Sequence, residues 1–187
     1  MTTEMRSALL RVLPFLAVII AICVAVTRQK INQRDIGIQP PASYKTFFAW
    51  WVFFLVFTVT TELVLFKAGL LQVTHWHHPF TSSVIRIGGI VLLAPVAEEL
   101  IFRGLLLHKL LKWKIRPHMA VISQAVVFVL LHSFTFENTI SSNIGIAQSF
   151  IDACLYAYAR QHTCSLYTPV AMHASGNCIA VLEQFIL

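Results

Sequence analysis

Long apolar runs alternate with short polar segments along the whole chain, and this pattern predicts membrane-spanning helices. A spanning helix needs about 20 mostly apolar residues. Six runs of this kind can be traced, of which the fifth is short and carries Asp152. They cover approximately residues 8–27, 46–66, 83–107, 118–136, 144–158 and 165–186. The pattern therefore predicts an all-α, polytopic transmembrane bundle of about six helices.

The first run has two interpretations. Arg6 and Arg11 precede its apolar centre, and small residues occur near its end, as in a secretory signal peptide. A retained spanning helix is the favoured interpretation, because the run is long and further apolar runs follow it.

Composition agrees with a membrane protein. The chain has 187 residues, of which 57% are apolar and 12% are charged, whereas a soluble domain carries about 25% charged residues. The net charge of +6 is not gathered in one stripe, since the Lys and Arg residues fall mostly between the apolar runs. We therefore expect membrane lipid as a partner and no nucleic acid.

The distribution of Lys and Arg predicts an orientation. With six spans, the loops after the first, third and fifth helices share one side, which carries nine of these residues against four on the other side. Because cytoplasmic loops are enriched in Lys and Arg, the three loops are predicted to face the cytoplasm and both termini the outside. The nine are Arg28, Lys30, Arg34, Lys45, Lys109, Lys112, Lys114, Arg116 and Arg160.

The four cysteines match no zinc knuckle, CxxC pair or disulfide framework. Cys23, Cys154 and Cys178 lie in apolar runs, which favours small buried apolar side chains. A bridge between Cys154 and Cys164 is the alternative.

Three ionisable residues interrupt the third run, in the stretch APVAEELIFRG. Glu99 and Arg103 are four positions apart, so on a helix they share a face and can pair. Glu98 is turned by about 100° from Glu99. The pair would leave Glu98 without a local cation, which suits a general base in an apolar setting. A structural salt bridge between helices is the alternative.

Two further apolar runs carry polar residues that could meet these carboxylates. His132 closes FVLLH in the fourth run, and His173 and Asn177 share a face in HASGN of the sixth. Either group alone could be a hydrogen-bonded packing feature. Together with Glu98, they predict a polar chamber inside the bundle, because ionisable groups at membrane depth tend to face its interior.

The chamber would hold what hydrolysis of a peptide bond needs. A glutamate and a histidine can activate water, while a second histidine and an amide can stabilise an oxyanion. Two histidines and a carboxylate, here Glu98, His132 and His173, can alternatively bind a zinc ion that activates water. The residues alone leave both mechanisms open, and no other cofactor is indicated.

The three motifs resemble the CPBP family of intramembrane proteases, also called the ABI domain, which includes CAAX proteases and bacteriocin-processing enzymes. The family pattern is EExxxR, FxxxH and HxxxN or HxxxD on successive helices. This chain has EELIFR (98–103), FVLLH (128–132) and HASGN (173–177), in that order. The resemblance implies a protease core over residues 85–182, preceded by helices and linkers over 1–84 and followed by a tail over 183–187.

The resemblance also implies roles for the motif residues. Glu98 would be the water-activating base, aided by His132, with Glu99 and Arg103 as the supporting pair. The oxyanion site would be formed by His173 and Asn177. Some descriptions of the family instead make the histidines and the glutamate zinc ligands, as in a metalloprotease.

The family's substrates are peptides or proteins. Eukaryotic members resemble type II CAAX endopeptidases, whose substrates are prenylated, whereas many bacterial members serve bacteriocin immunity or peptide processing. The short chain is closer to a bacterial member, which implies a location in the bacterial cytoplasmic membrane. Two rivals to an endopeptidase are a non-catalytic scaffold or self-immunity protein of the same fold, and a transporter that relays protons.

Residues outside the motifs are weaker candidates. Asp152 is a secondary candidate for lining the chamber, and Glu62, near Lys67, is expected to extend toward the membrane surface. The HWHH run over residues 75–78 could bind a metal, but an anchor at the membrane interface is favoured, because tryptophan is enriched there.

Overall fold

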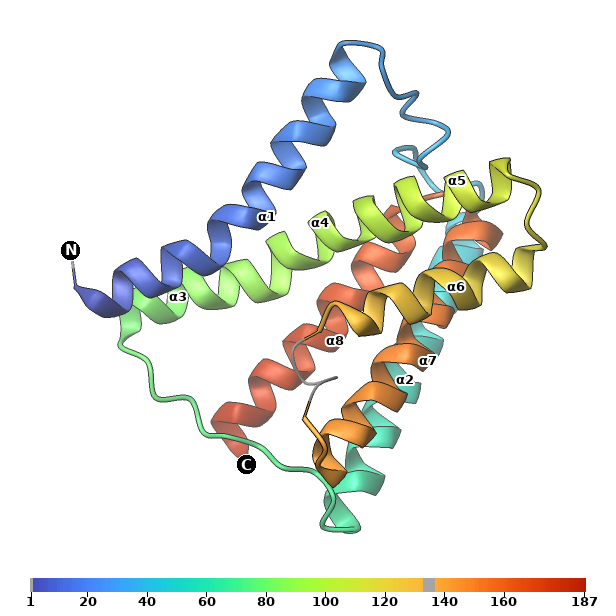
Figure 1. Ribbon diagram of the computed structural model, residues 1–187. Coiled ribbons are helices and arrows are strands. Elements are labelled where there is room, and N and C mark those ends of the chain that lie inside the picture. Colours follow the sequence, from blue (N-terminus) through green and yellow to red (C-terminus); the bar gives the residue numbers. More distant parts are fainter. Residues whose placement is uncertain (1, 133–136) are drawn as a thin grey trace.

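The computed structural model describes residues 2–132 and 137–187, and within them all regular secondary structure is helical. Six continuous helices form a bundle, which confirms the predicted fold class (Figure 1). The third is one unbroken helix built from five segments. The bounds are α1 Thr3–Thr27, α2 Tyr44–Lys67, the third helix from Phe80 to Lys112, α6 Pro117–Leu130, α7 Ile140–Thr163 and α8 Tyr167–Ile186.

Two π-helical segments interrupt the third helix on either side of the paired glutamates. Pro95 has no backbone N–H, so the carbonyl four residues earlier cannot receive its usual α-helical hydrogen bond. The first π segment ends just before this proline, and such segments are frequent at functional sites. The five segments are α3 Phe80–Gly88, η1 Gly89–Leu93, α4 Ala94–Glu99, η2 Leu100–Leu106 and α5 Leu107–Lys112.

Several helix boundaries differ from the sequence prediction; the first helix begins at Thr3 rather than near residue 8, and the third ends at Lys112 rather than near residue 107. The fourth helix was predicted to reach residue 136, but α6 ends at Leu130 and His132 follows its end; residues 133–136 lie outside the described part. The fifth helix is longer than the predicted 144–158. It begins at Ile140, where Thr139 and Ser142 form a reciprocal capping box.

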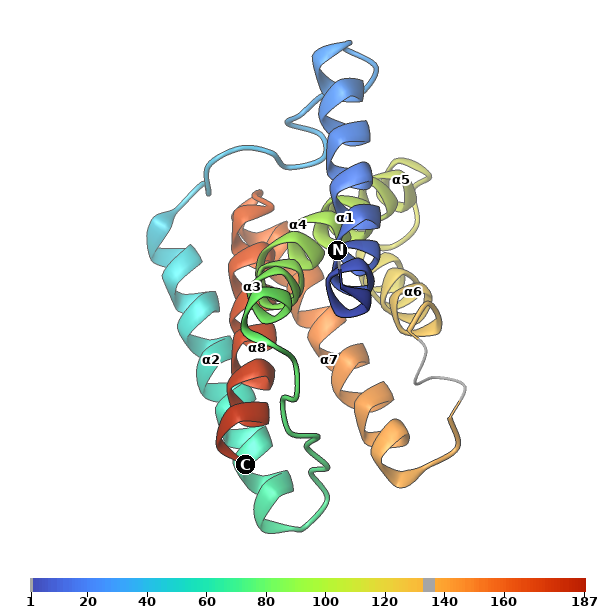
Figure 2. The same ribbon diagram turned by 90° about the vertical axis from the view of Figure 1, so that its left-hand side faces the viewer.

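The outer surface of the bundle is apolar, as a lipid environment requires. Among the described residues, α1 and α2 are long and apolar enough to cross a membrane, and only 11% and 6% of their most apolar windows are buried. Figure 2 shows α2 along the outside of α8, and α1 packed on the face formed by α3 and α4. The motif residues of the third helix and of α8 lie on the helices that α1 and α2 flank.

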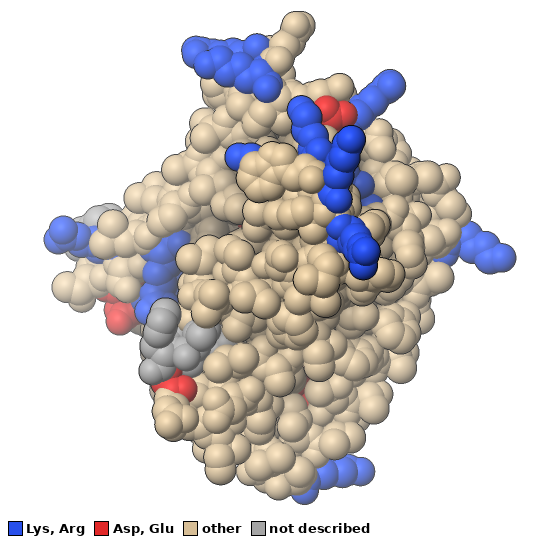
Figure 3. Space-filling model, turned by 45° about the vertical axis from the view of Figure 1, so that its right-hand side comes forward, with Lys and Arg blue, Asp and Glu red and all other residues tan. Residues whose placement is uncertain are grey.

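The loops sort to two opposite ends of the bundle, as the six-span prediction requires. At one end, the Ala42 N–H donates to the carbonyl oxygen of Thr163, and the Leu166 N–H donates to that of Gly37. These bonds join the loop after α1 to the loop after α7. At the other end, the Trp76 N–H donates to the carbonyl oxygen of Gln184, near the C-terminus. Lys and Arg side chains gather at the first end, at the top of Figure 3. The cytoplasmic orientation of this end remains a prediction.

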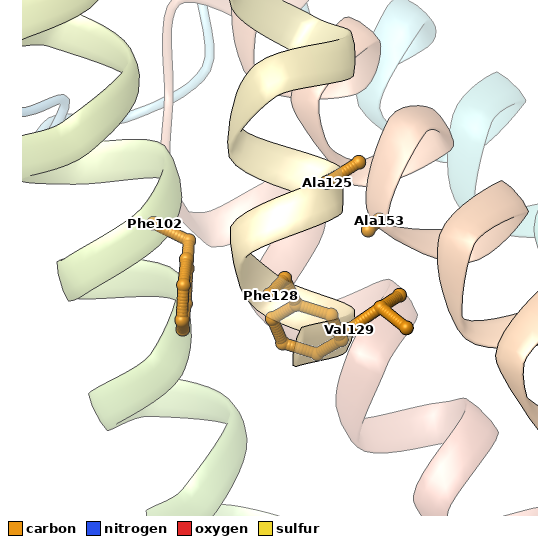
Figure 4. Packing of buried hydrophobic residues seen from close by; sticks show 5 residues of the cluster. All are labelled: Phe102, Ala125, Phe128, Val129 and Ala153. Carbon is orange, nitrogen blue, oxygen red and sulfur yellow. The ribbon is translucent and has the colours of Figure 1, made fainter. Parts of the chain in front are cut away.

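Apolar side chains of η2, α6 and α7 pack together in a buried cluster. Phe102 and Phe128 meet edge to face with ring centroids 5.0 Å apart, beside Ala125, Val129 and Ala153 (Figure 4). The small alanines let α6 and α7 approach closely, as in other helix pairs packed in membranes.

All four cysteines are free thiols, so the Cys154–Cys164 bridge is absent. The expectation of buried side chains is wrong for Cys23 and Cys178, which are exposed on the bundle surface. An apolar run facing lipid looks the same in sequence as one facing a protein core, because lipid tails are as apolar as leucine.

Gly176 allows α8 to lie close against α2 and α7. A Cβ at this position would sit 3.4 Å from the Phe54 ring and 3.5 Å from the Tyr156 hydroxyl. We expect Gly176→Val to destabilise the protein by about 1–3 kcal/mol, the usual cost of overpacking. Thermal unfolding in detergent would measure it, with the exposed neighbour Cys178→Val as the control. Equal melting temperatures for the two variants would contradict the proposed contact.

Candidate active site

The ion pair predicted from helical spacing is present at the centre of the bundle. Arg103 Nη1 donates to Glu99 Oε1 at 2.9 Å, and neither side chain is exposed. Arg103 Nη2 donates to the carbonyl oxygen of Ala153 at 3.1 Å. The guanidinium carbon also lies 4.7 Å from the ring centre of Phe128 and 5.1 Å from that of Tyr156. These contacts hold the charged pair in place from three helices.

His173 connects this pair to the other glutamate. Its Nδ1 lies 2.9 Å from Glu99 Oε1, and its Nε2 lies 3.8 Å from Glu98 Oε2. Because an ionised carboxylate only accepts hydrogen bonds, we assign a proton to Nδ1 and direct Nε2 toward Glu98. Tyr156 stacks on the imidazole, with centroids 5.0 Å apart and planes at 17°. The four-residue spacing along the helix predicted only the contact of Glu99 with Arg103. The contact of Glu99 with His173 was not predicted.

The two glutamates differ in their access to reactants. The Glu98 side chain is 20% exposed, whereas that of Glu99 is fully buried. Glu98 makes no ion pair with Arg103 among the described residues, and it lies within electrostatic range of both His173 and His132. The first glutamate is therefore the more accessible of the two, although it is not among the residues that line the cavity beside His173.

His132 is held by the turn that ends α6. Its Nδ1 lies 2.8 Å from the carbonyl oxygen of Phe128, and the two rings are 4.6 Å apart. A carbonyl oxygen can only accept, so Nδ1 carries the proton in this contact. The four-residue spacing of FVLLH thus brings the histidine back over the end of its own helix.

Asn177 bonds to the π segment η1. Its Nδ2 donates to the carbonyl oxygen of Ile90 at 2.8 Å. The nitrogen must face this carbonyl, because the amide oxygen cannot donate. One of the two Nδ2 hydrogens is thus used for holding α8 against the third helix, and the sequence offered no sign of this contact.

A cavity of about 280 Å³ brings several predicted residues together. His132, His173 and Asn177 all line it. Asp152, a secondary candidate from the sequence, lines it as well. The expectation that Glu62 extends toward the membrane surface is wrong, because it faces this cavity and accepts a hydrogen bond from Gln148 at 2.9 Å. The remaining lining residues are Thr58, Phe128, Gly145, Gln148, Ser149, Tyr156, Gly176 and Ala180.

The residues suggested as zinc ligands do not form a ready metal site. Within residues 2–132 and 137–187, no three His, Cys, Asp or Glu side chains are grouped closely enough to hold one ion. In the candidate set, His173 Nδ1 is bonded to Glu99 and His132 Nδ1 to a backbone carbonyl, contacts that zinc-binding histidines also make and that therefore do not argue against a metal.

The family assignment rests on one positive comparison. Neither the curated proteins nor the solved structures give a match. The model of the family described as type II CAAX prenyl endopeptidase Rce1-like matches residues 44–179. This match covers well over half of the chain, from the start of α2 to within α8, and includes all three motifs. The chain therefore belongs to the Rce1-like family of type II CAAX prenyl endopeptidases.

Proposed function

We propose that this protein is an intramembrane endopeptidase that hydrolyses a peptide bond with a water molecule activated by Glu98. Family membership supports a membrane-embedded protease that acts on peptides. The observation that carries the mechanism is the placement of His173, whose Nδ1 bonds Glu99 and whose Nε2 faces the accessible Glu98. One imidazole thus joins a buried supporting pair to an exposed base.

In the proposed reaction, Glu98 accepts a proton from water as the water oxygen attacks the peptide carbonyl carbon. A general base of this kind contributes about 10²–10⁴-fold to a rate. Glu98 then returns the proton to the amine that leaves when the C–N bond breaks. His132, within electrostatic range of Glu98, assists in holding the water.

The carbonyl oxygen becomes an oxyanion during this attack and needs donors. In the proposed mechanism, protonated His173 donates from Nε2, and Glu99 stabilises the imidazolium from the opposite side. The second Nδ2 hydrogen of Asn177 adds another donor in the same cavity. Donors fixed in advance are effective in a site of low dielectric constant, because they need no reorganisation when the charge develops.

We further propose a metal-free mechanism, because no three His, Cys, Asp or Glu side chains in the described part of the chain are grouped closely enough to hold one ion. Purified protein is expected to contain much less than one zinc per chain, and cleavage is expected to persist after treatment with a chelator. Elemental analysis beside a cleavage assay would check this. Loss of cleavage on chelation that is restored by added zinc would instead support the metalloprotease alternative, with Glu98, His132 and His173 as ligands.

The proposed substrates are a lipidated CAAX-type protein or a peptide such as a bacteriocin precursor. The test is cleavage of a peptide library, with and without an attached isoprenoid, by protein reconstituted in lipid nanodiscs. Mass spectrometry would identify new termini. Glu98→Ala and His173→Ala are expected to abolish cleavage while both variants still accumulate in the membrane. Cleavage retained by both variants would contradict the proposed mechanism. A self-immunity phenotype retained by both variants would favour the scaffold alternative.

A further inference from the structure

The cavity beside His173 has a second polar wall that the proposed hydrolysis does not use. This wall, formed by Thr58 and Glu62 of α2 with Gln148 and Asp152 of α7, faces the same space as His132, His173 and Asn177. A substrate whose scissile carbonyl lies at His173 would therefore place a neighbouring side chain near the wall.

The oxygen atoms of this wall are incompletely satisfied. Gln148 Nε2 donates to Glu62 Oε1, but Glu62 Oε2 is buried and has no hydrogen-bond partner among the described residues. Thr58 Oγ1 is in the same situation. For Asp152, the described part of the chain shows no hydrogen bond and no ion pair. Both helices of the wall therefore carry oxygen atoms for which the described residues provide no hydrogen-bond donor.

No described Lys or Arg lines the cavity beside the two carboxylates of the wall. The basic groups that share its lining are the imidazoles of His132 and His173. Arg103, behind the cavity, is already bonded to Glu99 and to a backbone carbonyl. Carboxylates at membrane depth are costly, and they are usually paired with a cation or mark the path of a ligand. A basic side chain that enters the cavity would supply such a cation.

We infer that Glu62 and Asp152 bind a basic side chain, Lys or Arg, of the peptide substrate and thereby determine which peptides are cleaved. This inference rests on the proposed function, because it concerns the same cavity. A bound ammonium or guanidinium group would donate to the carboxylates of Glu62 and Asp152. The Gln148 amide would hold Glu62 in position through the bond that it already makes.

The test compares two peptides that differ at one position, lysine against norleucine, which has a side chain of similar length without the charge. A series of such peptide pairs places the varied residue at successive positions on both sides of the scissile bond. At one position, wild-type protein is expected to cleave the lysine peptide with at least about tenfold higher kcat/KM, the size of effect expected from one charge-assisted hydrogen bond.

Asp152→Asn and Glu62→Gln are each expected to lower this lysine-to-norleucine ratio about tenfold. Asp35→Asn, which removes an exposed carboxylate from a loop far from the cavity, should leave the ratio unchanged. A purely structural role for Glu62 and Asp152 would slow cleavage of both peptides equally and leave the ratio at its wild-type value. That result, or a wild-type ratio near one at every position, would overturn the inference while the proposed function stands.

Binding gives a second readout that is independent of cleavage. In nanodiscs, the Glu98→Ala variant is expected to bind the lysine peptide more tightly than the norleucine peptide, and adding Asp152→Asn should remove the difference. Equal binding of the two peptides to Glu98→Ala would contradict the inference. If wild-type protein cleaves no peptide but this binding preference is present, the proposed function fails and the cation-binding wall remains.

Discussion

Replacement of Glu98 by glutamine is expected to reduce peptide cleavage by about 10²–10⁴-fold, the usual contribution of a general base. Glutamine keeps the size of the side chain and its hydrogen-bonding capacity but cannot accept the proton of the attacking water. Glu98 is the partly exposed member of the glutamate pair and lies 3.8 Å from His173 Nε2. The measurement is kcat/KM for a cleavable peptide, made with protein in nanodiscs.

The same substitution should leave the fold intact. Glu98 is not part of the buried ion pair, so its loss exposes no uncompensated charge in the bundle. Accumulation in the membrane and the melting temperature are expected to match wild type. Glu183→Gln, a carboxylate of α8 outside the cavity lining, is the matched control and should keep its activity. A Glu98→Gln variant with less than a tenfold loss would show that another group activates the water.

Replacement of Arg103 by methionine is expected to destabilise the protein by about 3–5 kcal/mol, the cost of breaking a buried ion pair. Arg103 is 1% exposed and Glu99 is fully buried, so the substitution leaves a carboxylate without its cation inside the bundle. The variant also loses the bond to the Ala153 carbonyl that ties the third helix to α7. Reduced accumulation and a lower melting temperature in detergent are the expected observations.

A double variant separates the charge effect from lost packing. Glu99→Leu combined with Arg103→Met removes both charges, and apolar replacements of a buried pair are often close to neutral in stability. We therefore expect the double variant to recover most of the stability and to remain inactive, because His173 loses the acceptor that orients it. Lys112→Met, an exposed site on the same helix, should change stability by no more than about 0.5 kcal/mol. Equal losses for the single and double variants would show that packing, not charge, governs stability here.

Much of the site is encoded in short spacings that the sequence displays directly. Glu99 and Arg103 pair because residues four apart meet on any helix. The contact of His132 with the Phe128 carbonyl follows from the same four-residue interval. Apolar runs also reveal where the helices are, because a chain in lipid must satisfy its backbone within each helix.

The end of α6 shows where the prediction of helices from apolar runs fails. An apolar run continues past Leu130, so the pattern extends the predicted helix through His132 and beyond. The structure places His132 after the helix end. Apolar composition indicates a lipid or core environment but contains no stop signal, and this stretch has neither glycine nor proline to supply one.

Contacts between helices were decided only by the tertiary structure. The bond of Glu99 to His173, the bond of Asn177 to Ile90 and the inward position of Glu62 each depend on how two helices are rotated and aligned against one another. The sequence by itself determined the helices, the three motifs and the pairing within one helix, because those depend on the regular geometry of a single segment. Which glutamate is buried, which histidine joins the two and which carboxylates face the cavity follow from packing, since spacing along one helix says nothing of the side chains that another brings to it.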